Sequence, residues 1–148
     1  MKRSQRPAVV AVLVLLPTLL LAACGVVARP DAAAWDDQAA QALTDASSQV
    51  ATARLALVSA RDGRTWSAYT TVLVAQAEEA AGKAEENLSR VQVPAARADD
   101  AATVLDLLDR AVDLVAEARA HAVSGRYGDA GLLEDLDSLA GRLRQAAP

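Results

Sequence analysis

The chain lacks most of the residues from which metal and disulfide sites are built. Its 148 residues include one Cys, one His and no Phe, and the other aromatic residues are two Trp and two Tyr. A single Cys cannot close an intrachain disulfide, and metal sites need several His, Cys or carboxylate ligands close together. We therefore expect no metal site and no cofactor, and a fold stabilised by helix packing alone.

An excess of basic charge is also lacking. Residues 1–23 hold three of the 15 cationic and none of the 19 acidic side chains, which leaves 12 cations against 19 acids and a formal net charge of −7. An acidic surface is repelled by the phosphates of nucleic acid and by anionic lipid headgroups. No nucleic acid partner is expected.

Catalytic motifs are missing as well. Ser124 follows His121 by three residues, but the sequence places no third group beside them, as nucleophilic catalysis would require. Adjacent acids such as Glu78 and Glu79 point about 100 degrees apart around a helix and do not share a proton. The run Gly125–Gly128 follows no strand, so it does not resemble a phosphate loop. We interpret His121 as a surface residue near a helix end and expect no enzyme.

What the chain does have begins with residues 1–23. Lys2, Arg3 and Arg6 form a basic start, and the mainly apolar run 8–21 follows them. This order, with small residues before a cut, is typical of a secretory signal peptide. The run is shorter than the roughly 20 apolar residues of a membrane span.

The next residues, Leu21-Ala22-Ala23-Cys24, resemble the lipobox of bacterial lipoproteins. That resemblance implies that a diacylglyceryl group is attached to the Cys24 thiol, and that cleavage before Cys24 makes it the first residue of the mature protein. It further implies a location at the cell membrane, lipid-anchored and facing outside the cytoplasm. The alternative is an ordinary signal peptide that leaves Cys24 as a free, reactive thiol.

Apolar residues recur at spacings of three and four over four later stretches, which predicts four amphipathic helices. Asp31, Thr65 and Asp129 are the expected N-caps, and Pro94 fits the first turn of the third helix. Asp62-Gly63 and Ser124-Gly125 are expected to end the first and third helices. The expected buried stripes are Trp35, Ala39, Ala42, Ala46, Val50, Ala53, Leu57 and Ala60; Trp66, Tyr69, Leu73, Ala77, Ala80, Ala84, Leu88 and Val91; Ala98, Ala101, Leu105, Leu108, Val112, Val115 and Ala118 or Ala122; and Leu132, Leu136, Leu139 and Leu143.

Short connections between these helices favour antiparallel neighbours. The predicted fold is all-α: an antiparallel up-down bundle of four helices, the fourth shorter, behind an N-terminal signal peptide. We divide the chain into residues 1–23 as signal peptide, 24–31 as lipidated Cys and tether, and 32–148 as the bundle domain. As a whole it resembles the small helical lipoproteins of high-GC Gram-positive bacteria, a resemblance that implies no particular activity.

One cluster near two of the connections combines aromatic and Arg residues, which are favoured in recognition hot spots. Its members are Arg61, Arg64, Trp66, Tyr69, Arg126 and Tyr127. In an up-down bundle the first and third connections share one end, so this cluster is a candidate interaction surface. Alternatively, Trp66 and Tyr69 plug the end of the bundle while the arginines face water.

These features predict a non-enzymatic, membrane-anchored envelope lipoprotein that acts as a protein interaction or scaffold module, with an envelope protein as its candidate partner. The alternative function is a small-ligand-binding or sensory bundle that holds an apolar molecule between its helices. The Ala-rich stripes favour tight packing and therefore the first function.

Overall fold

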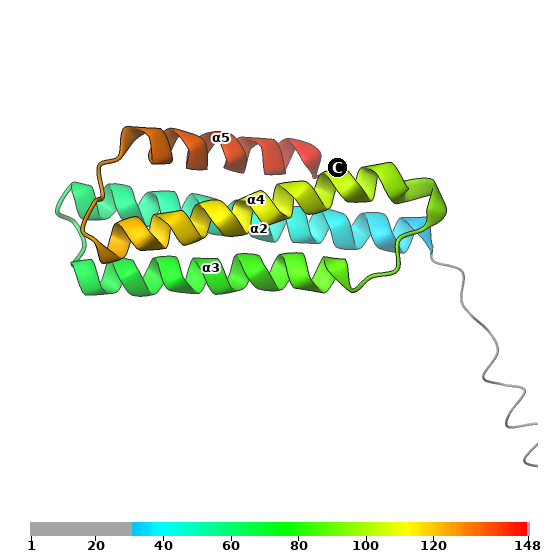
Figure 1. Ribbon diagram of the computed structural model, residues 1–148, viewed down its shortest axis with the longest axis horizontal. Coiled ribbons are helices and arrows are strands. Elements are labelled where there is room, and N and C mark those ends of the chain that lie inside the picture. Colours follow the sequence, from blue (N-terminus) through cyan, green and yellow to red (C-terminus); the bar gives the residue numbers. More distant parts are fainter. Residues whose placement is uncertain (1–30, 148) are drawn as a thin grey trace, which may run out of the picture.

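The computed structural model describes residues 31–147, which form four long antiparallel helices (Figure 1). The elements are α2 (Ala32–Arg61), α3 (Ser67–Ser89), the short 3₁₀ turn η2 (Ala95–Arg97), α4 (Ala98–Val123) and α5 (Ala130–Ala146). The predicted all-α bundle with a shorter fourth helix is therefore confirmed. The signal peptide and Cys24 lie outside the described residues.

Helices α2 and α4 form the centre of the bundle. Each of them packs against all three of the other long helices, while α3 and α5 lie on opposite sides of this pair (Figure 1). Helix α5 has 17 residues against 30 in α2, so it covers only part of the α2–α4 pair. Within the described part of the chain, no helix combines the length and apolarity of a membrane span.

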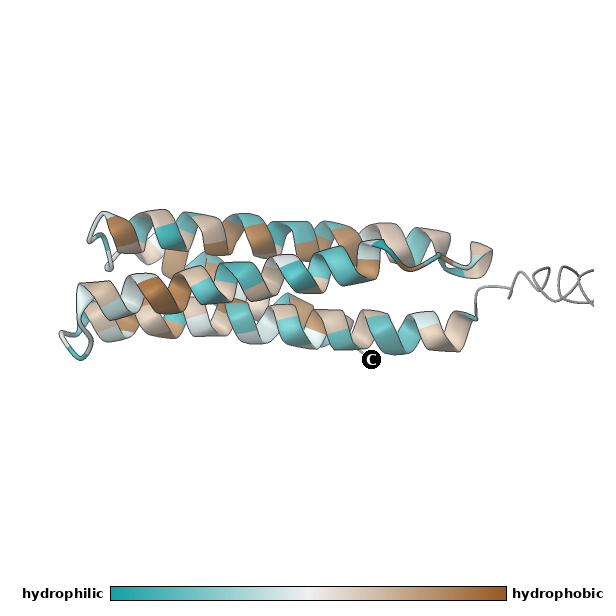
Figure 2. Cartoon of the chain, turned by 90° about the horizontal axis from the view of Figure 1, so that it is seen from below, coloured by the Kyte–Doolittle hydropathy of each residue, from teal (hydrophilic) through white to brown (hydrophobic). Residues whose placement is uncertain are grey.

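The core consists mainly of Ala, Leu and Val side chains, which allow the helix axes to approach closely. The stripes predicted for α2 and α5 are buried apart from Ala60, which is half-buried. Their buried members are Trp35, Ala39, Ala42, Ala46, Val50, Ala53 and Leu57 in α2, and Leu132, Leu136, Leu139 and Leu143 in α5. Along each ribbon, hydrophobic and hydrophilic residues alternate accordingly (Figure 2).

The predicted buried face of α3 is partly wrong. The predicted Ala77, Ala84 and Leu88 are buried, but Thr70, Val74 and Ala81 occupy the core in place of their predicted neighbours Tyr69, Leu73 and Ala80. Each one-residue shift turns the face by about 100 degrees. The Thr70 hydroxyl is accommodated because it donates a hydrogen bond to the carbonyl oxygen of Trp66 at 3.1 Å. Trp66 itself occupies the N-cap position that was predicted for Thr65, without a side-chain capping bond.

Helix α4 departs from prediction at its start and on part of its buried face. It starts at Ala98, after η2, because Arg97 has a non-helical backbone conformation (φ −118°, ψ 10°) that separates Pro94 from the helix. Near the other end His121 is only 6% exposed, so its assignment to the surface is wrong. In the middle of the helix, Leu107 and Ala111 are buried, whereas the predicted Leu105 and Val112 are half-buried.

Two of the predicted N-caps and the predicted end of α2 are confirmed by local hydrogen bonds and backbone geometry. Asp31 and Asp129 accept hydrogen bonds from the backbone N–H groups of Ala33 and Leu132, both at 3.1 Å. After α2, Gly63 adopts a left-handed conformation (φ +69°), and its N–H donates to the carbonyl of the third residue before it at 3.0 Å. Glycine adopts this conformation without the steric cost that other residues pay.

Candidate interaction surface

Two connections meet at one end of the bundle, which we call the loop end: residues 62–66 between α2 and α3, and residues 124–129 between α4 and α5 (Figure 1). The second connection lies against the end of α2, since a Cβ atom built on Gly128 would lie 3.6 Å from Cδ of Arg61. The structure thus brings together the two segments that were predicted to share one end. The opposite end, where α2 and α4 begin, we call the entry end.

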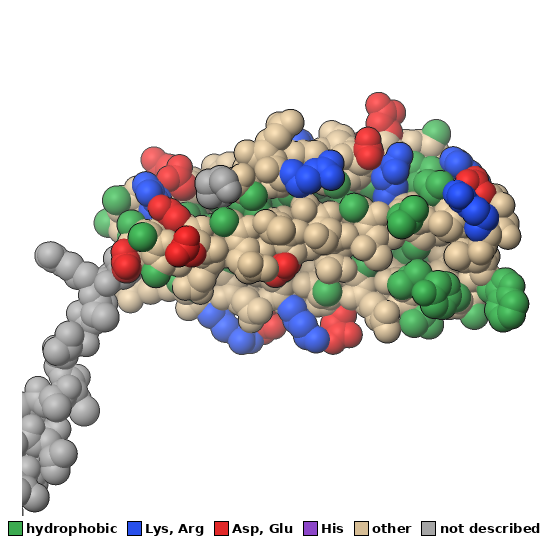
Figure 3. Space-filling model, turned by 180° about the vertical axis from the view of Figure 1, so that it is seen from behind, with side chains coloured by type: hydrophobic (Ala, Val, Ile, Leu, Met, Phe, Trp, Pro, Cys, Tyr) green, Lys and Arg blue, Asp and Glu red, His purple; other side chains and the backbone are tan. Residues whose placement is uncertain are grey.

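Trp66 and Tyr69 do not plug the bundle. Their exposed fractions are 86% and 57%, and that of Val72, three residues further along α3, is 53%. The spacing of three places these side chains on one solvent-facing side of α3. Figure 3 shows hydrophobic side chains gathered over this part of the molecule. Clustered exposure of large apolar side chains is typical of protein interaction surfaces, so these residues form the candidate interaction surface.

The two arginines beside this surface share one carboxylate. Arg61 Nε lies 3.0 Å from Asp62 Oδ1, and Arg64 Nη2 lies 2.7 Å from Asp62 Oδ2. The hydrogen bond from Arg61 and the positive charge of both guanidinium groups hold the pKa of Asp62 below its usual value. These contacts position the arginines and leave the three residues with a combined charge of +1.

Arg126 and Tyr127, the two cluster members in the second connection, differ in their exposure to solvent. Arg126 is exposed, and its Nε donates a hydrogen bond to Oγ of Ser124 at 3.0 Å. Tyr127 is half-buried and packs against the core. The exposed part of the candidate interaction surface therefore contains Trp66, Tyr69 and the arginines, while Tyr127 packs against the core.

The sequence interpretation missed exposed aliphatic residues. Val72 and Leu55 are 53% and 62% exposed, and Val123, at the last turn of α4, is 65% exposed. The exposure of Val72 could have been inferred from the sequence, because Val72 follows Tyr69 at the same spacing of three residues that separates Tyr69 from Trp66. The prediction that Trp66 and Tyr69 belong to the buried face of α3 prevented that inference.

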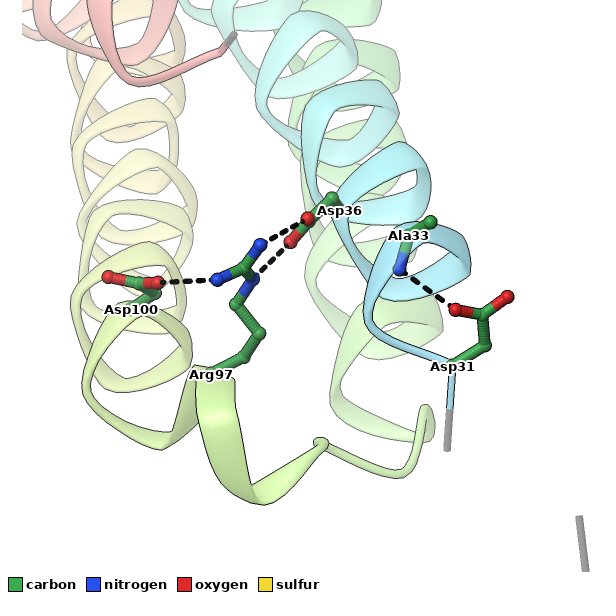
Figure 4. Close-up of polar contacts among 5 residues, drawn as sticks. All are labelled: Asp31, Ala33, Asp36, Arg97 and Asp100. Atoms are coloured by element: carbon green, nitrogen blue, oxygen red, sulfur yellow. Dashed lines mark hydrogen bonds and ion pairs between the residues drawn. The ribbon is translucent and has the colours of Figure 1, made fainter. Parts of the chain in front are cut away.

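The entry end contains an open groove between α2 and α4, beyond the last residue of α5. Its volume is about 530 Å³. At its rim, the Arg97 guanidinium lies between Asp36 of α2 and Asp100 of α4 (Figure 4). A smaller cleft of about 300 Å³ between α4 and α5 is lined mainly by charged side chains.

Residues 31–147 contain no group of three or more His, Cys, Asp or Glu side chains that could hold a metal ion. Cys24 cannot be placed in relation to either surface, because it precedes the described residues. No protein-family model, curated protein or solved structure matches this chain.

Proposed function

We propose that the chain is a non-enzymatic lipoprotein, anchored at the outer face of the cell membrane through Cys24, whose helical bundle binds an envelope protein. The observation that supports binding is the exposure of Trp66 and Tyr69 on one side of α3. The lipobox residues support the anchor.

The position of the aromatic surface suits a partner that lies away from the membrane. Helix α2 has 30 residues, so at about 1.5 Å per residue it separates the entry end from the loop end by roughly 45 Å. An anchor at Cys24 joins the bundle through residues 25–31 at the entry end. The aromatic surface then faces away from the bilayer.

Trp66 and Tyr69 are suited to supply the binding free energy. Large aromatic side chains bury much area with few rotatable bonds, and Trp, Tyr and Arg dominate hot spots. Arg64 and Arg126 add positive charge at the same end of an otherwise acidic domain. An envelope protein with an apolar pocket and acidic flanks is the complementary partner.

Site-specific cross-linking in cells tests this function. A photoreactive amino acid at Tyr69 should give one discrete adduct, and Trp66→Ala should reduce its yield several-fold. The same photoreactive group at Ser138, which is exposed on α5, is the control. Equal adducts from both positions, or an adduct unaffected by Trp66→Ala, would contradict binding through this surface.

The anchor is tested separately through Cys24. The intact chain should fractionate with membranes, and its mass should show a modified N-terminal Cys24. Cys24→Ala should abolish both results because the thiol is the attachment point. Unchanged membrane fractionation of this variant would disprove lipid anchoring through Cys24.

The alternative function, a bundle that binds a small apolar ligand, is favoured by the entry-end groove. Its volume of about 530 Å³ lies within the range of roughly 300–1,000 Å³ that is usual for ligand sites. The groove is open to solvent instead of enclosed between the helices, so its occupant would lie on the bundle surface.

A further inference from the structure

The entry-end groove exists because α5 is too short to cover the whole α2–α4 pair. Its walls come from α2 and α4, and Ala146 near the end of α5 closes one side. The apolar residues that line it are Trp35, Ala39, Leu43, Val104, Leu107 and Ala146. Four of them, all but Val104 and Ala146, are buried, so the groove has a densely packed apolar floor.

Trp35 lacks a hydrogen-bond partner. Its side chain is 3% exposed, and its buried indole Nε1 makes no hydrogen bond to any described residue. A buried N–H donor without an acceptor costs free energy. Because this N–H is shielded from solvent, Trp35 contributes its ring to the groove and not a hydrogen bond to an occupant.

The rim of the groove is acidic. Asp36 uses both carboxylate oxygens to accept hydrogen bonds from Arg97, at 2.7 Å each. Asp100 lies 3.9 Å from the same guanidinium, and its side chain is 66% exposed. The three groups have a combined charge of −1, and the Asp100 carboxylate is accessible to a cation. This rim attracts an ammonium group and repels an anionic one.

We propose that the entry-end groove binds one acyl chain of a zwitterionic phospholipid, with the lipid ammonium group next to Asp100. The apolar floor accepts the hydrocarbon, and the acidic rim selects against lipids of net negative charge. This inference rests on the proposed anchoring only for the supply of lipid, since α2 starts at the end to which the anchor is joined.

Native mass spectrometry of the full chain tests the groove and the anchor in the same spectrum. The probes are phosphatidylethanolamine and phosphatidylglycerol with identical acyl chains, each added in mixed detergent micelles. The intact mass reports modification of Cys24, whereas non-covalent adducts report the groove. We expect a single bound phosphatidylethanolamine, in several-fold excess over phosphatidylglycerol.

Three variants locate the binding site. Val104→Phe puts a larger ring into the groove wall and should reduce the adduct several-fold, while Val123→Phe, on the exposed loop end of the same helix, should leave it unchanged. Asp100→Asn removes an exposed charge and should abolish the preference for phosphatidylethanolamine. Circular dichroism verifies that each variant remains helical.

Absence of an adduct, or an adduct that survives Val104→Phe, would overturn the groove proposal. A preference that is unchanged by Asp100→Asn would overturn the role of the rim. An unmodified Cys24 in a chain that still binds phosphatidylethanolamine would refute the proposed anchor and support the groove.

If Val104→Phe loses helicity, fluorescence quenching replaces it. Trp66→Phe leaves Trp35 as the sole indole, and phosphatidylethanolamine labelled with a nitroxide on its acyl chain should quench Trp35 more strongly than a headgroup-labelled lipid. Stronger quenching by the headgroup label would overturn the proposal.

Discussion

Arg97 forms a two-pronged ion pair with Asp36 across the entry end of the bundle. Its Nε donates to Oδ1 and its Nη2 to Oδ2, each at 2.7 Å, although the two residues are 61 positions apart in the sequence. Both side chains are half-buried (Figure 4). The pair therefore connects the start of α2 to the turn before α4, where α5 no longer contributes to the packing.

Replacement of Arg97 by Met should lower the midpoint of thermal unfolding by a few degrees. The variant keeps the apolar stem but leaves the Asp36 carboxylate without its bidentate donor, and such paired bonds are stronger than neutral ones. Arg110→Met is the control, because its pair with Asp106 is exposed and lies within one helix. Equal midpoints for the two variants would show that the long-range pair has no special contribution.

The stability of the bundle should decrease in acid, partly through Asp36. The hydrogen bond from Arg97, together with its charge, holds the pKa of Asp36 below its ordinary value of 3.8. A carboxylate whose pKa is lowered by folding stabilises the folded state above the unfolded-state pKa, and this contribution is lost as the pH falls through the folded-state pKa.

Urea unfolding of the wild type and of Asp36→Asn, measured between about pH 3 and pH 7, checks this titration. The difference in unfolding free energy between the two proteins should be largest at neutral pH and should shrink in acid. Asp62 and Glu79 also have lowered pKa values, so both proteins should lose some stability. A difference that does not vary with pH would refute the assignment to Asp36.

Leu136→Ala should destabilise the bundle strongly. Leu136 is fully buried on α5, and truncation of a buried Leu to Ala typically costs about 2–5 kcal/mol. Leu55→Ala is the matched control, since its side chain is 62% exposed, and exposed substitutions usually change stability by less than about 0.5 kcal/mol. Urea denaturation measures both, and a similar loss for both variants would show that α5 is not firmly packed.

Two Gly→Ala substitutions should act in opposite directions. Gly63 has a φ of +69°, so Ala there should destabilise the protein by about 1 kcal/mol or more. Gly82 lies within α3 and a Cβ atom at this position meets nothing within 4 Å, so Ala should stabilise by about 0.4–1 kcal/mol. The comparison uses thermal or urea unfolding, and destabilisation by Gly82→Ala would indicate a packing constraint.

Local sequence was sufficient for much of the fold. The caps at Asp31 and Asp129, the left-handed turn at Gly63 and the Leu stripe of α5 depend on interactions within a few residues. In α5 the Leu residues are separated by polar ones, so only one face can be buried. The number of helices and their antiparallel order follow from these signals and from the short connections.

The buried face of α3 could not be predicted in the same way. Tyr69 stands beside Thr70 and Leu73 beside Val74, so two adjacent faces have similar hydrophobicity, and packing against α2 and α4 selects between them. For the candidate surface, sequence reasoning placed Trp66 and Arg126 at one end. It did not predict that Trp66 points outward while Tyr127 packs inward.

The sequence by itself determined the helices, most of their ends and their order, because hydrophobic spacing, capping and turn residues act over short distances. Only the tertiary structure decided the burial of His121, the exposure of Trp66 and the position of the groove beyond α5. Each of these depends on which neighbouring helix covers a given face and how far along the bundle that helix extends. Such relationships arise between segments distant in the sequence, as in the contact of Arg97 with Asp36.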